Sequence, residues 1–224
     1  MGNYRLHRVA VVIILLVFAA IPISQSTWQL PNLNELIQAN ITPTTSVTAE
    51  LKNLIVKGRA PKTGYERSKF GDGWQTVAGC TTRNRVLIRD LASVVIGDDC
   101  KVDSGILRDP YTGKTITFMR GETTSDDVQI DHVVALSNAW QTGAQQLDVI
   151  QRIKLANDPL NLLAVDGPAN EAKSDSDAAT WLPPNKVFRC AYVKRQVAVK
   201  SKYGLWVTLA ERDAMATVLS RCPA

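Results

Sequence analysis

A histidine that directly follows an aspartate is the feature of this sequence best suited to chemistry. Asp131 and His132 stand in the β-branched run QIDHVV, and the one other histidine, His7, lies close to the N-terminus. Adjacent residues of a regular strand point to opposite faces, so this pair is unsuited to binding one metal ion side by side. The sequence therefore predicts two separate tasks for the two side chains. The plain alternative is a structural histidine beside a salt-bridge aspartate.

Two short strands and a helix are expected to position this pair. The β-branched run 128–134 predicts the strand that carries it. Apolar residues recur at near-helical spacing from 137 to 156 and predict an inserted helix. A second strand, 160–165, ends at an Asp-Gly turn, and Pro168 suits the first position of a following helix.

Amide and lysine side chains lie on this second strand and helix. Asn161 falls in the strand, and the helix would present Asn170, Lys173 and Asp177 on one face, because they are three and four residues apart. Each of the first three has a plain alternative. Asn161 can close a hairpin turn, Asn170 can start a helix, and Lys173 can be a solvated surface lysine.

The whole constellation resembles a known family. Strand, strand and helix with these side chains are similar to the HNH, or ββα-metal, nucleases, in the variant where Asp replaces the first His and Asn the last. The segments DHVVALSNAWQTGA, NDPLNLLAVDGPANEAKSD and WLPP resemble exported bacterial HNH-family proteins related to the C-terminal nuclease domain of modification-dependent restriction enzymes. The resemblance runs from about Gly64 to the end, with its motif core at 128–177. It implies an α+β fold: a ββα-metal core with an inserted helix, additional short antiparallel strands and C-terminal helices.

The resemblance also implies a role for each side chain. Asp131 would be a metal ligand, and His132 the general base that takes a proton from the attacking water. Asn161 would brace the hairpin so that the backbone holds the imidazole in its working tautomer, and Asn170 would supply a second metal ligand through its amide oxygen. Lys173 would add positive charge at the scissile phosphate. A carboxylate and an amide oxygen are hard ligands, which suits one divalent cation, Mg²⁺ or Mn²⁺.

The function implied is a secreted, metal-dependent endonuclease that hydrolyses phosphodiester bonds. DNA is favoured over RNA as the substrate, with low sequence specificity, because no separate recognition module is visible in the sequence. The alternative is a non-catalytic exported module that keeps the fold and binds nucleic acid or the cell envelope. Another secreted hydrolase fits less well, since no Ser-His or spaced acidic pair stands out. The modest formal charge of +5 does not decide among these.

Three arginines within seven positions form a further candidate binding feature. Arg83, Arg85 and Arg89 stand in CTTRNRVLIRDL, and guanidinium groups match the oxygens of phosphates. A solvated helix face with local salt bridges explains them equally well. The preceding loop 64–75, GYERSKFGDGWQ, is dense in glycine and aromatic residues, which favours a turn-rich segment pinned by its rings over a substrate contact.

Four cysteines, Cys80, Cys100, Cys190 and Cys222, indicate disulfides. None belongs to a Cys-x-x-Cys pair, which excludes a zinc ribbon and a thioredoxin-like redox site. Three connectivities are possible, and the pairing of sequence neighbours, Cys80 with Cys100 and Cys190 with Cys222, is preferred. Four free buried thiols are the alternative.

The N-terminus predicts export. Basic residues precede the apolar run 9–23 and small polar residues follow it, so 1–26 is typical of a secretory signal. No Ala-x-Ala site occurs, and a retained anchor on the outer face of the membrane is the alternative; once the signal is cleaved, no stable membrane span is expected. Residues 27–48, rich in Thr, Asn, Gln and Pro, predict a linker or arm, and 49–224 the nuclease domain.

The remaining elements follow from periodicity and turn signals. A short helix is expected from Ala49 to Gly58, and antiparallel strands within 101–118 around a turn at 109–113. Two further helices are expected at 188–202 and 208–219.

Overall fold

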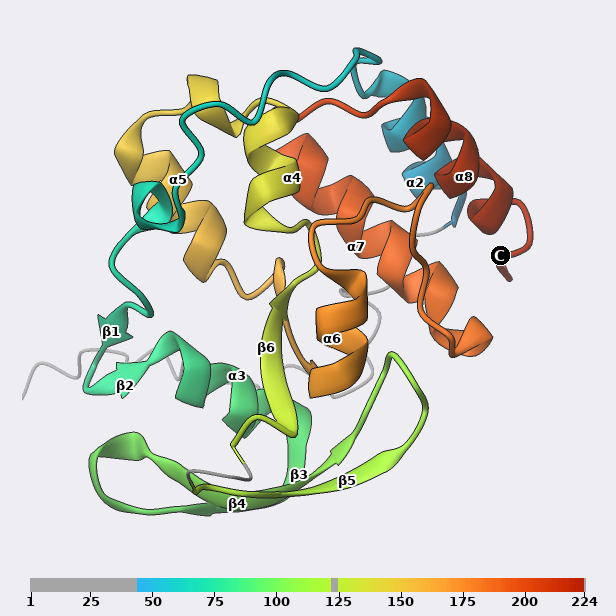
Figure 1. The fold of residues 1–224 in the computed structure, drawn as a ribbon. Coiled ribbons are helices and arrows are strands. Elements are labelled where there is room, and N and C mark those ends of the chain that lie inside the picture. The colour runs from blue at the N-terminus through green and yellow to red at the C-terminus, as the bar shows by residue number, and fades with distance from the viewer. Residues whose placement is uncertain (1–43, 122–124, 224) are drawn as a thin grey trace, which may run out of the picture. The chain divides into compact units, whose positions relative to one another are not determined.

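The computed structural model describes residues 44–121 and 125–223, so the predicted signal and most of the predicted arm lie outside the described residues. Figure 1 shows helices combined with small antiparallel sheets, which confirms the predicted α+β class. None of the described helices is long and apolar enough to cross a membrane. The elements in chain order are α2 (Thr44–Asn53), η1 (Arg67–Phe70), β1 (Thr76–Val77), β2 (Cys80–Thr81), α3 (Thr82–Asp90), β3 (Leu91–Ile96), η2 (Asp98–Cys100), β4 (Val102–Arg108), β5 (Thr115–Met119), β6 (Val128–His132), α4 (Leu136–Gln141), η3 (Ala144–Gln146), α5 (Val149–Asn157), β7 (Leu162–Asp166), α6 (Gly167–Lys173), η4 (Lys186–Phe188), α7 (Arg189–Lys202) and α8 (Leu209–Leu219).

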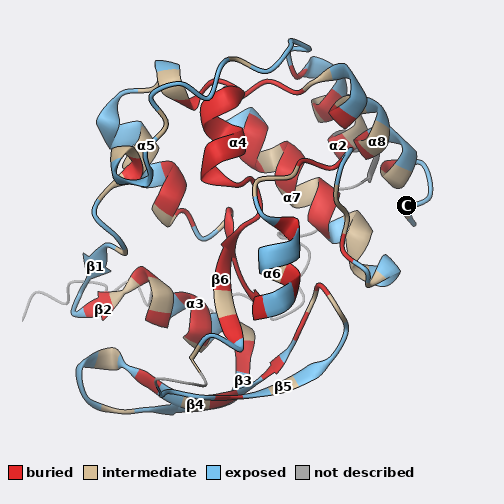
Figure 2. Ribbon diagram, viewed as in Figure 1, coloured by how far each residue is buried: buried red, intermediate tan, exposed pale blue. Residues whose placement is uncertain are grey.

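Strand β6 pairs with β7 in antiparallel orientation, and Figure 1 shows β6 running from the larger sheet towards α4. The register pairs Val128 with Asp166 at one end and His132 with Leu162 at the other. Every residue of β7 is buried, so this strand is covered on both faces. Figure 2 shows buried residues along β6 and throughout α4 beyond it. Both predicted strands are confirmed, with ends shifted by one or two residues.

Helix α6 follows β7 without a linker. The Asp166 carboxylate accepts a hydrogen bond from Ala169 N, and Pro168 stands in the first turn. A Cβ atom on Gly167 would lie 2.2 Å from the carbonyl oxygen of Asp126, so only glycine permits this close approach of two backbones. Because α6 packs against both β6 and β7, the expected strand–strand–helix unit is present.

A second sheet, ordered β3-β4-β5, is antiparallel throughout. The β4–β5 hairpin occupies the predicted strand region, and Gly113 N donates to Asp109 O at the expected turn. Strand β3 is additional, since the sequence did not indicate it. Leu87 of α3 and Phe118 of β5 share one core with Leu162 of β7, so this core joins the sheet to the β6–β7 hairpin.

The prediction of a single helix over 137–156 is wrong. Three shorter elements, α4, η3 and α5, occupy this stretch. Gly143 adopts a φ of 129°, which ends the first helical segment, and a Cβ atom there would lie 3.2 Å from the Trp206 ring. The Asp148 carboxylate then starts α5 by accepting from Gln151 N. The apolar spacing is genuine, but a glycine and a new N-cap divide the helix.

Helices α2, α7 and α8 contribute to another core, which includes Val47, Tyr192 and Met215. Helices α7 and α8 match their predicted ranges to within one residue. The capping box between Thr208 and Glu211 begins α8. Helix α2 begins at Thr44, before the predicted boundary at residue 49, so the end of the predicted arm belongs to the folded part.

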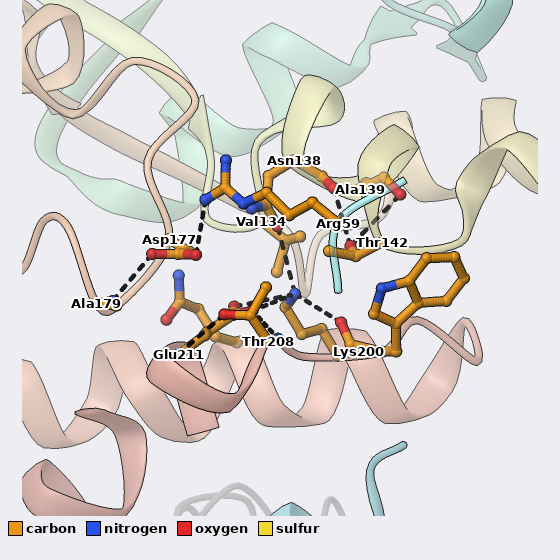
Figure 3. Close-up of polar contacts among 12 residues, drawn as sticks. Arg59, Val134, Asn138, Ala139, Thr142, Asp177, Ala179, Lys200, Thr208 and Glu211 are labelled. Atoms are coloured by element: carbon orange, nitrogen blue, oxygen red, sulfur yellow. Dashed lines mark hydrogen bonds and ion pairs between the residues drawn. The ribbon is translucent and has the colours of Figure 1, made fainter. Parts of the chain in front are cut away.

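A buried polar cluster connects α7 to α8 and α4 (Figure 3). Lys200 Nζ lies 2.9 Å from Glu211 Oε1 and 3.1 Å from Oε2, and both residues are fully buried. The same ammonium donates to Asn138 Oδ1 and Trp206 O. Burial lowers the pKa of Lys200 and raises that of Glu211, while the ion pair opposes both shifts. The Asn138 Nδ2 atom finds no acceptor among the described residues.

Two disulfides, Cys80–Cys100 and Cys190–Cys222, confirm the predicted pairing. The first joins β2 to η2. The second joins the start of α7 to the segment that follows α8, so the last helix is tied covalently to its neighbour.

Replacing Cys190 and Cys222 together by serine is expected to lower the free energy of unfolding by about 2–4 kcal/mol, because the cross-link restricts the unfolded chain. Urea unfolding of this double variant beside the oxidised parent measures the difference. Cys80→Ser with Cys100→Ser is the matched control, and its shorter loop of 20 residues rather than 32 predicts a slightly smaller loss. A Cys190/Cys222 double variant as stable as the parent would contradict the expectation.

Candidate active site

Asp131 and His132 point to opposite faces of the β6–β7 hairpin, as strand alternation predicts. The Asp131 carboxylate contacts Tyr111 and Lys173, whereas the His132 ring lies against Trp74 and hydrogen bonds to the backbone of α5. Both side chains are largely buried, and both line one cleft. The hairpin therefore places two chemically different groups at the same opening.

The His132 imidazole is oriented by one backbone carbonyl. Its Nε2 atom lies 2.9 Å from Ala156 O, and a carbonyl can only accept, so Nε2 carries the hydrogen and Nδ1 carries the lone pair. The Trp74 ring stacks beside the imidazole, with centroids 5.7 Å apart and planes at 12°. Burial lowers the pKa of His132 to about 3. The ring is therefore neutral at physiological pH, with one nitrogen able to accept a proton.

Asn161 joins the segments on either side of this imidazole. It is fully buried, accepts from Val134 N at 2.8 Å, and donates to Val134 O and to Leu155 O. Its backbone oxygen also accepts from Val133 N. The loop that follows His132 is thereby tied to the end of α5, whose Ala156 carbonyl holds the ring. Asn161 is placed to position the histidine without touching it.

The Asp131 carboxylate is held from two sides. The Tyr111 hydroxyl donates to Oδ2, and Lys173 Nζ lies 2.9 Å from Oδ1. Burial raises the pKa of Asp131, and Lys173, Tyr111 and the backbone N–H of His132 oppose the rise. A carboxylate has about four lone-pair positions, so these two donors and the backbone N–H of His132 leave a position free for a further partner.

Lys173 is fully buried behind Asp131. Its ammonium also donates to His132 O at 2.9 Å, and the side chain does not line the cleft. This placement differs from the expectation that Lys173 reaches a phosphate. Its geometry instead suits it to fix Asp131 and the backbone of the neighbouring histidine.

The oxygen atoms at this end of the cleft suit a hard cation. Asp131 and Asn170 line the cleft together, and Asn170 Nδ2 donates to Gln129 Oε1, which leaves the amide oxygen for a ligand role. Within residues 44–121 and 125–223, no three His, Cys, Asp or Glu side chains gather at one point. A cation here would have few protein ligands and would complete its shell with water and phosphate oxygens, as Mg²⁺ commonly does. The residues present fit one divalent cation.

The cleft has a volume of about 570 Å³ and a wall of mixed charge. Lys62 is neutralised by Asp175 at 3.0 Å. The Arg67 side chain is exposed and makes no ion pair with any described residue, although it lines the cleft beside His132. An unpaired guanidinium at this position suits a phosphate oxygen.

Comparison with known proteins identifies the family. The model of the C-terminal domain of GmrSD restriction endonucleases matches residues 82–218, which is more than half of the chain. The chain belongs to this family. It is also 40% identical over 186 residues to a secreted protein of the fungus Arthroderma benhamiae described as uncharacterized, across 82% of this chain and 88% of that protein. No solved structure matches it.

The GmrSD C-terminal domain match encloses β6, β7 and α6, and with them Asp131, His132, Asn161 and Asn170. This confirms the resemblance to a restriction-enzyme nuclease domain. The match begins at Thr82, so the loop 64–75, called the strap below, lies outside it.

The structure separates the three arginines that the sequence placed together. Arg83 lines the cleft, and its guanidinium donates to Val128 O and to a second backbone carbonyl. The Arg89 guanidinium donates to the Asp90 carboxylate and to two backbone carbonyls. This is the local salt bridge that the alternative interpretation expected. Arg85 is exposed and does not line the cleft. Of the three, Arg83 alone is placed to meet a substrate in the cleft.

Sequence reasoning missed three residues around the site: Arg67, Trp74 and Tyr111. Two of them lie on the strap, where the aromatic residues were expected to serve only as anchors. Tyr65 and Phe70 do pack on Trp140 in that way, whereas Trp74 lies against His132. The two glycines before Trp74 were the available sign in the sequence that the backbone takes an unusual path there. Gly71 and Gly73 both adopt a φ of 103°.

Proposed function

We propose that this chain is a secreted endonuclease that hydrolyses phosphodiester bonds of nucleic acid, DNA in preference to RNA, with low sequence specificity. One divalent cation, Mg²⁺ or Mn²⁺, would assist. The observation that carries the proposal is His132, whose Nε2 is engaged by Ala156 O, so that Nδ1 is the proton acceptor beside a cleft lined by oxygen ligands. Membership of a restriction-endonuclease domain family supports nucleic acid as the substrate.

His132 acts as the general base. Its Nδ1 takes a proton from a water molecule, and the water oxygen attacks the phosphorus. The bond from phosphorus to the 3′ oxygen breaks, and that oxygen takes a proton from solvent water, which leaves a 5′-phosphate and a 3′-hydroxyl; the proton on His132 then returns to solvent. The geometry supports this assignment, because the bond from Nε2 to Ala156 O leaves Nδ1 of the neutral ring without a hydrogen.

The other residues bind or position. Asp131 and Asn170 would hold the cation, which when bound supplies charge stabilisation at the scissile phosphate and the leaving oxygen. Tyr111 and Lys173 hold Asp131 in place, and Asn161 holds the backbone around His132. Arg67 and Arg83 on the cleft wall would contact phosphates.

Export is supported by three independent features. The sequence begins with a signal-like segment, the two disulfides suit an oxidising compartment, and the fungal relative is described as secreted.

Purified protein incubated with supercoiled plasmid is expected to nick it in Mg²⁺ or Mn²⁺ and to stop when EDTA is added, because the oxygen ligands suit a hard cation. Gel electrophoresis of the open-circular form measures the rate, and protein with EDTA from the start is the control. Plasmid that is bound but never cut under either cation would favour the non-catalytic binding module instead.

A further inference from the structure

A second, smaller cavity adjoins the catalytic cleft. It has a volume of about 150 Å³, the order of one small ring system and too little for a base pair. Arg67, Trp74, His132 and Leu136 line both openings. Whatever enters the small cavity therefore lies beside the proton-accepting histidine.

The wall of this cavity is apolar apart from Arg67 and His132, and it contains no acidic side chain. Phe70, Trp74 and Leu136 supply side-chain surface, and Gly71 and Gly73 contribute bare backbone. Trp74 is only half-buried, so part of its ring remains available. An aromatic face of this kind stacks against a nucleobase regardless of base identity.

The strap that carries Trp74 is bound to α5 at Lys69 and at its last residue, Gln75. Arg152 Nε donates to Lys69 O at 3.0 Å, and Gln75 N donates to Asn157 Oδ1 at 2.9 Å. Between these anchors, a Cβ atom on Gly71 would lie 3.3 Å from Ile153, so the glycine lets the strap pack closely on the helix. These contacts hold the backbone of the strap, which forms one side of the cavity, against α5.

Arg67 adds the charge that an occupant would need. It is exposed, unpaired among the described residues, and lines both the cavity and the cleft. A nucleotide with its base against Trp74 would place its own phosphate within reach of Arg67 and His132. A base inside a regular duplex is paired and stacked, and cannot occupy a cavity of this size without leaving the helix.

From this arrangement we infer that the small cavity receives one unpaired nucleobase next to the scissile phosphate. The preferred substrate is then single-stranded or locally unpaired nucleic acid. This inference rests on the proposed nuclease function and names its substrate class.

The test uses the unaltered protein and labelled oligonucleotides of one sequence: single-stranded, fully paired, and paired with one mismatch. Once gel mapping has located the cut, an abasic residue replaces the nucleotide on each side of it in turn. Unpaired strands are expected to be cleaved about tenfold faster than the duplex. An abasic residue at one of the two positions is expected to lower the cleavage rate by a similar factor, because stacking on an aromatic ring is lost. Matching RNA strands show whether the preference for unpaired nucleotides holds for both sugars.

Two variants locate the effect. Trp74→Leu is expected to cleave the normal and the abasic strand at equal rates, whereas Trp74→Phe keeps a flat ring and most of the discrimination. Equal cleavage of single strand and duplex by the unaltered protein, together with indifference to both abasic positions, would overturn the inference while leaving the nuclease function standing. Failure to cut any strand in Mg²⁺ or Mn²⁺ is a different result, which overturns the proposed function and this inference with it.

Discussion

Replacement of His132 by alanine is expected to lower the rate of nucleic-acid cleavage by about 10²- to 10⁴-fold, the usual contribution of a positioned general base. Nδ1 is the nitrogen left free by the bond between Nε2 and Ala156 O, and no other histidine occurs among the described residues. Binding of the substrate should change little, because the proposed phosphate contacts come from Arg67 and Arg83 and not from His132. Single-turnover cleavage and a fluorescence binding titration measure the two quantities separately.

His132→Gln is the matched control for structure. A glutamine can still donate to Ala156 O and fills similar space, but it cannot accept a proton at neutral pH. Both variants should therefore show the same large loss of cleavage rate, and the glutamine variant should unfold at nearly the parental temperature. Cleavage by His132→Gln at the parental rate would show that the imidazole only supports the hairpin.

Replacement of Lys200 by methionine is expected to destabilise the protein by about 3–5 kcal/mol, because it leaves the Glu211 carboxylate buried without its charge partner. Asn138 Oδ1 and Trp206 O also lose a donor in this variant. Urea unfolding with the disulfides intact gives the free energy, and intrinsic tryptophan fluorescence follows the transition.

Lys200→Met combined with Glu211→Leu tests the cause. Removal of both charges from a buried pair is commonly neutral or stabilising, so the double variant should regain part of the loss even though the carbonyl and amide oxygens stay unpaired. A single variant within experimental error of the parent would show that the ion pair carries little stability. A double variant less stable than the single would point to lost packing instead.

Much of the core motif could be predicted because neighbours in sequence determine it. The Asp166-Gly167-Pro168 turn signals the end of β7 and the start of α6, and the structure adds that Gly167 also avoids a clash with Asp126 O. The Thr208 and Glu211 spacing likewise marks the start of α8. The disulfide partners are neighbours along the chain, which made the simplest pairing the preferred one.

The parts that could not be predicted depend on contacts between distant segments. Lysine normally keeps its ammonium in water, so nothing local indicated that Lys173 and Lys200 are fully buried. Asp131 stands 42 positions from Lys173 and 20 from Tyr111 in sequence, and only the folded hairpin, α6 and the β4–β5 turn bring them together. The contact between Trp74 and His132 also joins segments that are distant in sequence. It depends on hydrogen bonds between the backbone of the strap and side chains of α5, and no sequence pattern indicates these bonds.

The two donors on Asp131 make the carboxylate preorganised. Tyr111 donates to one oxygen and Lys173 to the other, while strand β6 holds the backbone, so any rotation of the carboxylate would break these bonds. A charged partner that arrives in the cleft meets dipoles already aligned, and the reorganisation that water would require is absent. The same rigidity sets a limit, because Asp131 cannot swing to follow a misplaced substrate. On the proposed function, the cation and the scissile phosphate would have to fit where Asp131 already lies, and Tyr111, from the turn between β4 and β5, helps to set that position.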